Sequence, residues 1–239
     1  MSEPVLIGCS HGTRSATGQQ TVDALRAAVA AARPELDVRA AHVDVHGPEL
    51  PDVVAGVVAE GRTGIVVPLL LSTGYHVKVD IAEAIAGTRG AVVAAPTLGP
   101  DPVLDRIVVS RLEEALGHPV TELDGEIVLA AAGSSNPRAA ADVEAAVRAL
   151  VELTGAPVRA GYFSAQEPTV ADAVAAARAR GAARVAVASY LLAPGVFSAR
   201  LDAAGADAVA APFGPHPALV ELVLQRYDEA RAAFLSPVD

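Results

Sequence analysis

Short apolar runs alternate with longer, alanine-rich amphipathic segments along the whole chain. The first run, residues 5–9 (Val-Leu-Ile-Gly-Cys), contains only apolar or small residues, as expected for a strand buried on both faces of a parallel sheet. The amphipathic segments that follow such runs end at glycine or before proline, which are helix stop signals. The pattern therefore predicts repeated β-α units around a parallel sheet.

The positions of these runs define the expected elements. In the first half the expected strands are residues 5–9, 37–45, 65–71 and 91–95, and the expected helices are residues 15–32, 49–60, 76–86 and 101–116. In the second half the expected strands are residues 126–131, 157–162, 184–192 and 206–210, and the expected helices are residues 139–153, 169–180 and 216–234.

The two halves repeat each other with a period of about 120 residues. Residues 95–102 (Ala-Pro-Thr-Leu-Gly-Pro-Asp-Pro) match residues 211–217 (Ala-Pro-Phe-Gly-Pro-His-Pro). We therefore predict an α/β protein of two tandem flavodoxin-like parallel-sheet domains related by internal duplication. The predicted domains are residues 1–121 and 122–239.

Composition narrows the possible partners. Hydrophobic residues make up 52% of the chain and charged residues 19%, and no apolar stretch reaches the roughly 18–20 residues of a membrane span. The net charge of -10 argues against nucleic-acid or anionic-membrane binding. The start has no basic region before the apolar run, and the only cysteine is Cys9, so we expect no signal peptide and a cytoplasmic location.

Histidines follow the ends of three predicted strands in the first half. His11 follows the first strand, His46 follows the second and His76 follows the third. In the strand order 2-1-3-4 the second and third strands flank the first, and ligands bind at the carboxyl ends of such strands. With neighbouring strands about 4.8 Å apart, His11 and His76 could bind one ion, and Asp44 or His46 could add a ligand. Imidazoles with a carboxylate suit Fe, Co, Ni or Zn rather than Ca or Mg.

A hydrogen-bonded surface role is the alternative for any single histidine at a strand end. We assign that role to His118 and His216, and leave His42 open. The second half has no matching histidines, since the region of Gly133 lies where His11 would be and Phe197 or Ser198 lies opposite His76.

Basic residues recur in both halves. The matched pairs are Arg14 with Arg138 and Lys78 with Arg200. Together with backbone N–H groups at the predicted helix starts, these residues suit a ligand that carries several carboxylates. A solvated surface role is the alternative interpretation.

Two motifs resemble those of a known family. The apolar strand that leads into Ser-His-Gly-Thr-Arg at residues 10–14, and residues 67–76 (Val-Pro-Leu-Leu-Leu-Ser-Thr-Gly-Tyr-His) followed by Asp80, are similar to the class II tetrapyrrole chelatases in their long, duplicated form. The resemblance spans both halves. It implies insertion of Fe²⁺ or Co²⁺ into sirohydrochlorin, a macrocycle with eight carboxylates, for sirohaem or cobalamin synthesis. The metal is then a substrate, and no organic cofactor is implied.

The resemblance also implies roles for individual residues. His11 becomes a metal ligand and proton acceptor, and His76 becomes the second ligand. The substrate-facing loop is Leu71, Ser72, Thr73, Gly74 and Tyr75. The family has a glutamate at the end of the second strand, followed shortly by a proline. Here Asp44 is nearest that place and His46 is an addition, so either could contact the metal or the macrocycle.

Other functions remain open at the level of sequence. A non-catalytic tetrapyrrole or metal carrier would use the same ligands. A histidine phosphatase has an Arg-His-Gly turn, but Ser10 occupies the arginine position here. The sequence does not choose among iron, cobalt and nickel. We expect a monomer or weak homodimer, because the duplicated chain supplies both walls of a cleft.

Overall fold

The parallel strands predicted by the apolar runs are present in the computed structural model, which describes residues 3–72 and 75–235, with the backbone alone at 75–78 and 202. The first sheet, in the order β2-β1-β3-β4, consists of β1 (Val5–Ser10), β2 (Val38–His42), β3 (Gly64–Pro68) and β4 (Val92–Ala94). The second sheet, in the order β6-β5-β7-β8, consists of β5 (Gly125–Ala131), β6 (Val158–Tyr162), β7 (Arg184–Tyr190) and β8 (Ala208–Val209). All of these pairings are parallel, so the predicted fold class is confirmed.

Helices connect the strands of each sheet. They are α1 (Ala16–Ala32), α2 (Leu50–Ala59), α3 (Tyr75–Ala86), α4 (Pro102–Leu116), α5 (Pro137–Thr154), α6 (Val170–Ala179) and α7 (Pro217–Leu235), with short 3-10 turns η1 (Val120–Glu122) and η2 (Ser198–Ala203). The side chains of Ser15, Asp101 and Asn136 accept hydrogen bonds from backbone N–H groups at the first turns of α1, α4 and α5. Among the described helices none is long and apolar enough to span a membrane.

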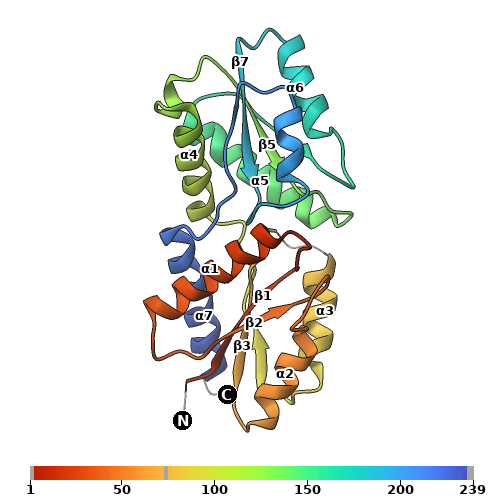
Figure 1. The fold of residues 1–239 in the computed structure, drawn as a ribbon, viewed down its shortest axis with the longest axis vertical. Coiled ribbons are helices and arrows are strands. Elements are labelled where there is room, and N and C mark those ends of the chain that lie inside the picture. The colour runs from red at the N-terminus through yellow and green to blue at the C-terminus, as the bar shows by residue number, and fades with distance from the viewer. Residues whose placement is uncertain (1–2, 73–74, 236–239) are drawn as a thin grey trace. The chain divides into compact units, whose positions relative to one another are not determined.

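The compact units of the structure differ from the sequence halves. The first unit contains Met1–Leu98 and Pro215–Asp239, and the second contains Gly99–Gly214. Helix α4, from the first half, packs on β7 and β8, whereas α7, from the second half, packs on α1 and β3 (Figure 1). The two halves therefore exchange their last helices, and the units do not follow the boundary that we predicted at residues 121–122.

Matching arginines hold the exchanged helices in place. Buried Arg226 of α7 donates to the carbonyl oxygens of Thr97 (3.1 Å) and Leu98 (3.2 Å), where the chain leaves the first unit. Arg111, at the same position of α4, donates to the carbonyl oxygen of Phe213 (2.9 Å), where the chain leaves the second unit. Each arginine thus satisfies carbonyl groups that follow the last strand of a sheet.

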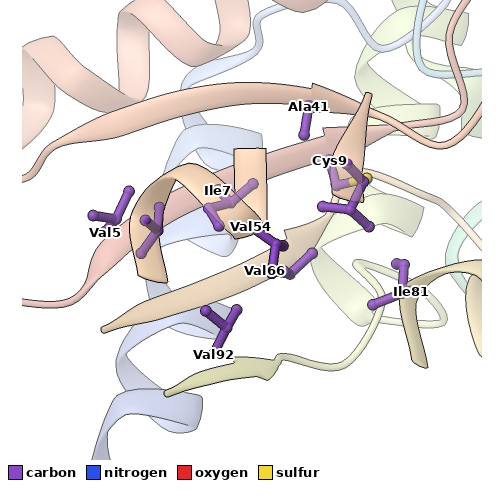
Figure 2. Packing of buried hydrophobic residues seen from close by; sticks show 10 residues of the cluster. Val5, Ile7, Cys9, Ala41, Val54, Val66, Ile81 and Val92 are labelled. Atoms are coloured by element: carbon purple, nitrogen blue, oxygen red, sulfur yellow. The ribbon is translucent and has the colours of Figure 1, made fainter. Parts of the chain in front are cut away.

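Strand β1 has two different buried faces. Val5, Ile7 and Cys9 face α2 and α3 in a cluster that Figure 2 shows from close by. Other members of the cluster come from β3, β4, α2 and α3: Val66, Val92, Val54 and Ile81. Because side chains alternate along a strand, Gly8 and Ser10 face α1 instead. His11 follows directly, at the carboxyl edge of the first sheet.

Candidate metal centre

The turn after β1 lies against the turn after β2. His11, the first residue after β1, is exposed, and Gly12 has a φ of +96°. A Cβ atom at Gly12 would lie 2.1 Å from the carbonyl oxygen of Asp44. Glycine is therefore required at position 12 for two reasons, its left-handed backbone and the close approach of the neighbouring turn.

Hydrogen bonds join the two turns. The Asp44 N–H donates to the His11 carbonyl oxygen (3.1 Å), and the Thr13 N–H donates to Nδ1 of His46 (3.4 Å). Three of the four residues predicted to bind metal, His11, Asp44 and His46, thus come from two turns bonded to each other. Among the side chains that the structure describes, no three His, Cys, Asp or Glu groups are close enough to hold a metal ion.

The turn after β2 is strained. Val45 has a φ of +73°, which is rare for a β-branched residue, and the His46 N–H donates across it to the Asp44 carbonyl oxygen (2.9 Å). Asp44 Oδ1 accepts a hydrogen bond from the Val45 N–H (2.6 Å). Such strain persists only where the surroundings maintain it, and it is common at functional sites. It also explains why β2 ends at His42, three residues earlier than predicted.

The chain after β3 leaves the sheet at the same edge. Pro68 of β3 pairs with Cys9 of β1, and the Leu69 N–H donates to the Cys9 carbonyl oxygen (2.6 Å). Leu71 and Ser72 are half-buried, and the backbone of His76 lies in the first turn of α3. The remaining predicted site residues here lie outside the described part of the structure, wholly for Thr73 and Gly74 and in their side chains for Tyr75, His76 and Lys78.

The predicted carboxylate-binding arginines are exposed. Arg14 precedes α1 in the first unit, while Arg138 in α5 and Arg200 in η2 belong to the second unit. Their role in substrate binding stays a prediction.

A buried polar network, which was not predicted from the sequence, lies at the end of β1 next to His11. Ser10 Oγ lies 2.8 Å from His42 Nδ1, and Arg26 of α1 donates to Ser10 Oγ (3.3 Å). Arg26 also donates to the carbonyl oxygens of Gly8 (2.9 Å) and Ala41 (3.2 Å). Because Arg26 can only donate, the Ser10 hydroxyl proton is available to His42 Nδ1. A signal was present in the sequence, since Ser10 follows an apolar run directly and His42 follows Ala40 and Ala41 near the end of the second predicted strand.

His42 links this network to the site. Its ring packs against the ring of His46, with centroids 4.0 Å apart. Burial, assisted by the charges of Arg26 and His46, lowers the pKa of His42 to about 4. His42 is therefore neutral at physiological pH.

Cys9 does not add a thiolate ligand to the centre. It is fully buried in the cluster between the first sheet and helices α2 and α3. Burial, opposed in part by the charge of Arg26, raises the pKa of the Cys9 thiol to about 12. A metal site needs the deprotonated thiolate, which this environment disfavours.

The second unit repeats the two turns without the histidines. A Cβ atom at Gly133 (φ +83°) would lie 1.9 Å from the Ser164 carbonyl oxygen, and the Ser164 N–H donates to the Ala132 carbonyl oxygen (3.1 Å). The Ser134 N–H donates to Gln166 Oε1 (3.3 Å). Strand register therefore equates His11 with Ala132, Asp44 with Ser164, and His46 with Gln166.

Replacing Gly12 by alanine tests the contact between the turns. We expect Gly12→Ala to lower the free energy of unfolding by about 3 kcal/mol or more, because the Asp44 carbonyl must move. The matched control is Gly61→Ala, where φ is +68° but nothing lies within 4 Å of the added Cβ, so only about 1 kcal/mol should be lost. Urea unfolding measures both, and equal losses would contradict the contact.

The environment of His42 predicts a pH dependence of stability. Its pKa is about 4 when folded and about 6.5 when unfolded, so the unfolded chain binds the proton more readily. The contribution is complete above pH 6.5 and is lost as the pH falls toward 4, by about 2–3 kcal/mol at pH 4.5. Urea unfolding of wild type and His42→Asn should differ in pH slope by this amount. An NMR titration of His42 with a midpoint near 6.5 would refute the expectation.

Comparison with known proteins places the chain in a family. The CbiX family model matches residues 5–115 and again residues 126–230. The sirohydrochlorin cobaltochelatase of Methanosarcina acetivorans is 25% identical over 124 residues, which are 46% of this chain and 95% of that protein.

Solved structures share the fold over nearly the whole chain. SirB from Bacillus subtilis with Fe³⁺ has a TM-score of 0.81 and is 22% identical, with 96% of each chain covered. SirB from Bacillus subtilis subspecies spizizenii in complex with cobalt has a TM-score of 0.77 and is 21% identical, again with 96% of each chain covered. Because the family model matches both halves, the chain belongs to the CbiX family, the class II sirohydrochlorin chelatases that its motifs resemble.

Proposed function

We propose that this protein inserts Fe²⁺ or Co²⁺ into sirohydrochlorin, for sirohaem or cobalamin synthesis. The observation that carries the proposal is the bonded pair of turns that brings His11, Asp44 and His46 to the carboxyl edge of the first sheet. Ligands of such sheets bind at that edge. The structures of SirB with Fe³⁺ and with cobalt support a metal-handling role for the shared fold.

The proposed ligands hold the ion loosely. His11 and His76 supply imidazole nitrogens, and the turn after β2 supplies a third ligand from Asp44 or His46. A chelatase must release its ion to the macrocycle, so open coordination positions are an advantage. Two or three neutral or singly charged ligands meet this need better than a closed site of four.

Metal insertion also requires acceptors for two pyrrole protons. As the ion leaves His11 for the macrocycle, each pyrrole N–H bond breaks, its electron pair stays on nitrogen to bind the ion, and the proton moves to a base. An imidazole freed from the metal is a suitable base near neutral pH. Because His11 is exposed, it can pass that proton to water.

The carboxylates of the macrocycle need cationic partners. We assign Arg14, Lys78, Arg138 and Arg200 to this role, because charge-assisted hydrogen bonds to carboxylates are stronger than neutral ones. The loop from Leu71 through Ser72, Thr73 and Gly74 to Tyr75 would contact the macrocycle beside the metal.

Two other functions are weaker. Ser10 occupies the place of the arginine in a histidine phosphatase turn, and it is buried and bonded to His42, so it supplies no cation for a phosphate. A carrier would use the same ligands as a chelatase, and multiple turnovers of sirohydrochlorin per chain separate the two. A cytoplasmic location and a monomeric or weakly dimeric state remain predictions.

Substitution of the two predicted histidine ligands tests the function. We expect His11→Ala and His76→Ala each to reduce the steady-state rate of chelation about a hundredfold, because a ligand and, at His11, a proton acceptor are lost. His118→Ala is the matched control and should leave the rate unchanged, since His118 lies half-buried in the loop after α4 and its ring bonds the Pro119 carbonyl oxygen of the same loop.

The measurement is the absorbance of sirohydrochlorin under anaerobic conditions with Fe²⁺, Co²⁺ or Ni²⁺. Wild-type rates in both His11→Ala and His76→Ala would refute the proposal. A wild-type protein that stops after one equivalent of macrocycle would indicate a carrier.

A further inference from the structure

The hydrogen bond to His46 determines which of its nitrogens carries the proton. Nδ1 accepts the Thr13 N–H, so it presents its lone pair to that group. A neutral imidazole has a single N–H, which must then be on Nε2. A metal ligand needs a free lone pair, but here Nδ1 is engaged and Nε2 is protonated. This tautomer is a hydrogen-bond donor and a poor ligand.

The second unit supports this assignment independently of any metal. Gln166, at the position of His46, uses its amide oxygen to accept the Ser134 N–H (3.3 Å). Its amide nitrogen then remains as a donor. The second unit has Ala132 at the position of His11, so it lacks that predicted metal ligand. The hydrogen bond from Ser134 to Gln166 is present all the same, and this kind of bond therefore does not depend on a neighbouring histidine ligand. His46 and Gln166 share an acceptor directed to the turn and a remaining N–H donor.

The buried network restrains the His46 ring. The ring packs against that of His42, which is bonded to Ser10, and Arg26 donates to Ser10 in turn. Rotation of the His46 ring to present another nitrogen would break the bond from Thr13 and disturb this ring contact. The second unit has Ala131 in place of Ser10 and Tyr162 in place of His42, so Gln166 has no equivalent of this serine–histidine support.

We propose that His46 binds substrate and does not bind metal, with its Nε2–H donating to a carboxylate of the macrocycle. This inference rests on the proposed function. His46 is half-buried, and among the described residues Nε2 has no hydrogen-bond acceptor from the protein. A carboxylate is the strongest acceptor that an eight-carboxylate ligand offers. Asp44 is then the third metal ligand.

The first test uses metal alone. Long-range ¹H–¹⁵N NMR of the full chain should show the Nε2–H tautomer of His46, unchanged when Zn²⁺ is added, while the His11 nitrogens shift. Calorimetry with Co²⁺ should give His46→Ala an affinity within about twofold of wild type. A shift of the His46 nitrogens with Zn²⁺, or a loss of Co²⁺ affinity of about tenfold or more in His46→Ala, would overturn the proposal.

The second test uses metal-free sirohydrochlorin, whose binding is followed by its absorbance. We expect His46→Ala and His46→Phe to raise its Kd about tenfold, because a hydrogen bond to a charged group is lost. Phenylalanine keeps the ring against His42 but has no N–H, so it separates donation from packing. His46→Gln reproduces the residue of the second unit and should restore the Kd to within about threefold of wild type.

Unchanged sirohydrochlorin affinity in His46→Phe would overturn the proposal, as would failure of His46→Gln to restore it while the variant stays folded. These readouts do not depend on turnover. A protein that binds metal and macrocycle as described but never chelates would refute the proposed function and leave the assignment of His46 intact.

Discussion

The close contact between the turns after β1 and β2 sets the relative positions of His11, Asp44 and His46 at the candidate site. Gly12 lies so near the Asp44 carbonyl that no side chain fits there, and the two backbone turns exchange the bonds from Asp44 to His11 and from Thr13 to His46. His11 therefore has its neighbours fixed by backbone geometry rather than by flexible side chains. Such preorganisation suits a site that must hold an ion briefly and in a defined place.

The second unit acts as an internal comparison for this arrangement. It keeps the glycine contact and the bonds between turns, at Gly133, Ser164 and Gln166, but has no counterpart of His11, His42 or His46. The buried support changes too: Gly8, which lies against the Arg26 side chain, corresponds to Leu129. Both halves thus share the backbone of the two turns, while His11, His42 and His46 and the buried network around Arg26 belong to the first half.

The sequence predicted the strands because each is a local apolar run, and the duplication because matched segments recur in the two halves. The strand order followed from the flavodoxin-like fold class, and the structure has it. It did not predict the exchange of α4 and α7, since an amphipathic pattern shows that a helix packs on a sheet but not on which of two similar sheets. The burial of Arg26 was not predicted, because an arginine in an alanine-rich helix usually faces water. His46 remained ambiguous because its role follows from a bond to the Thr13 backbone, which only the folded turns reveal.

The central claim is that metal is handled at the carboxyl edge of the first sheet and not at the matching edge of the second. Calorimetric titration of the full chain with Co²⁺ tests it most directly. We expect a single ion per chain in wild type and a loss of affinity of about a hundredfold in His11→Ala. Two ions per wild-type chain, or one ion bound equally well by His11→Ala, would contradict it.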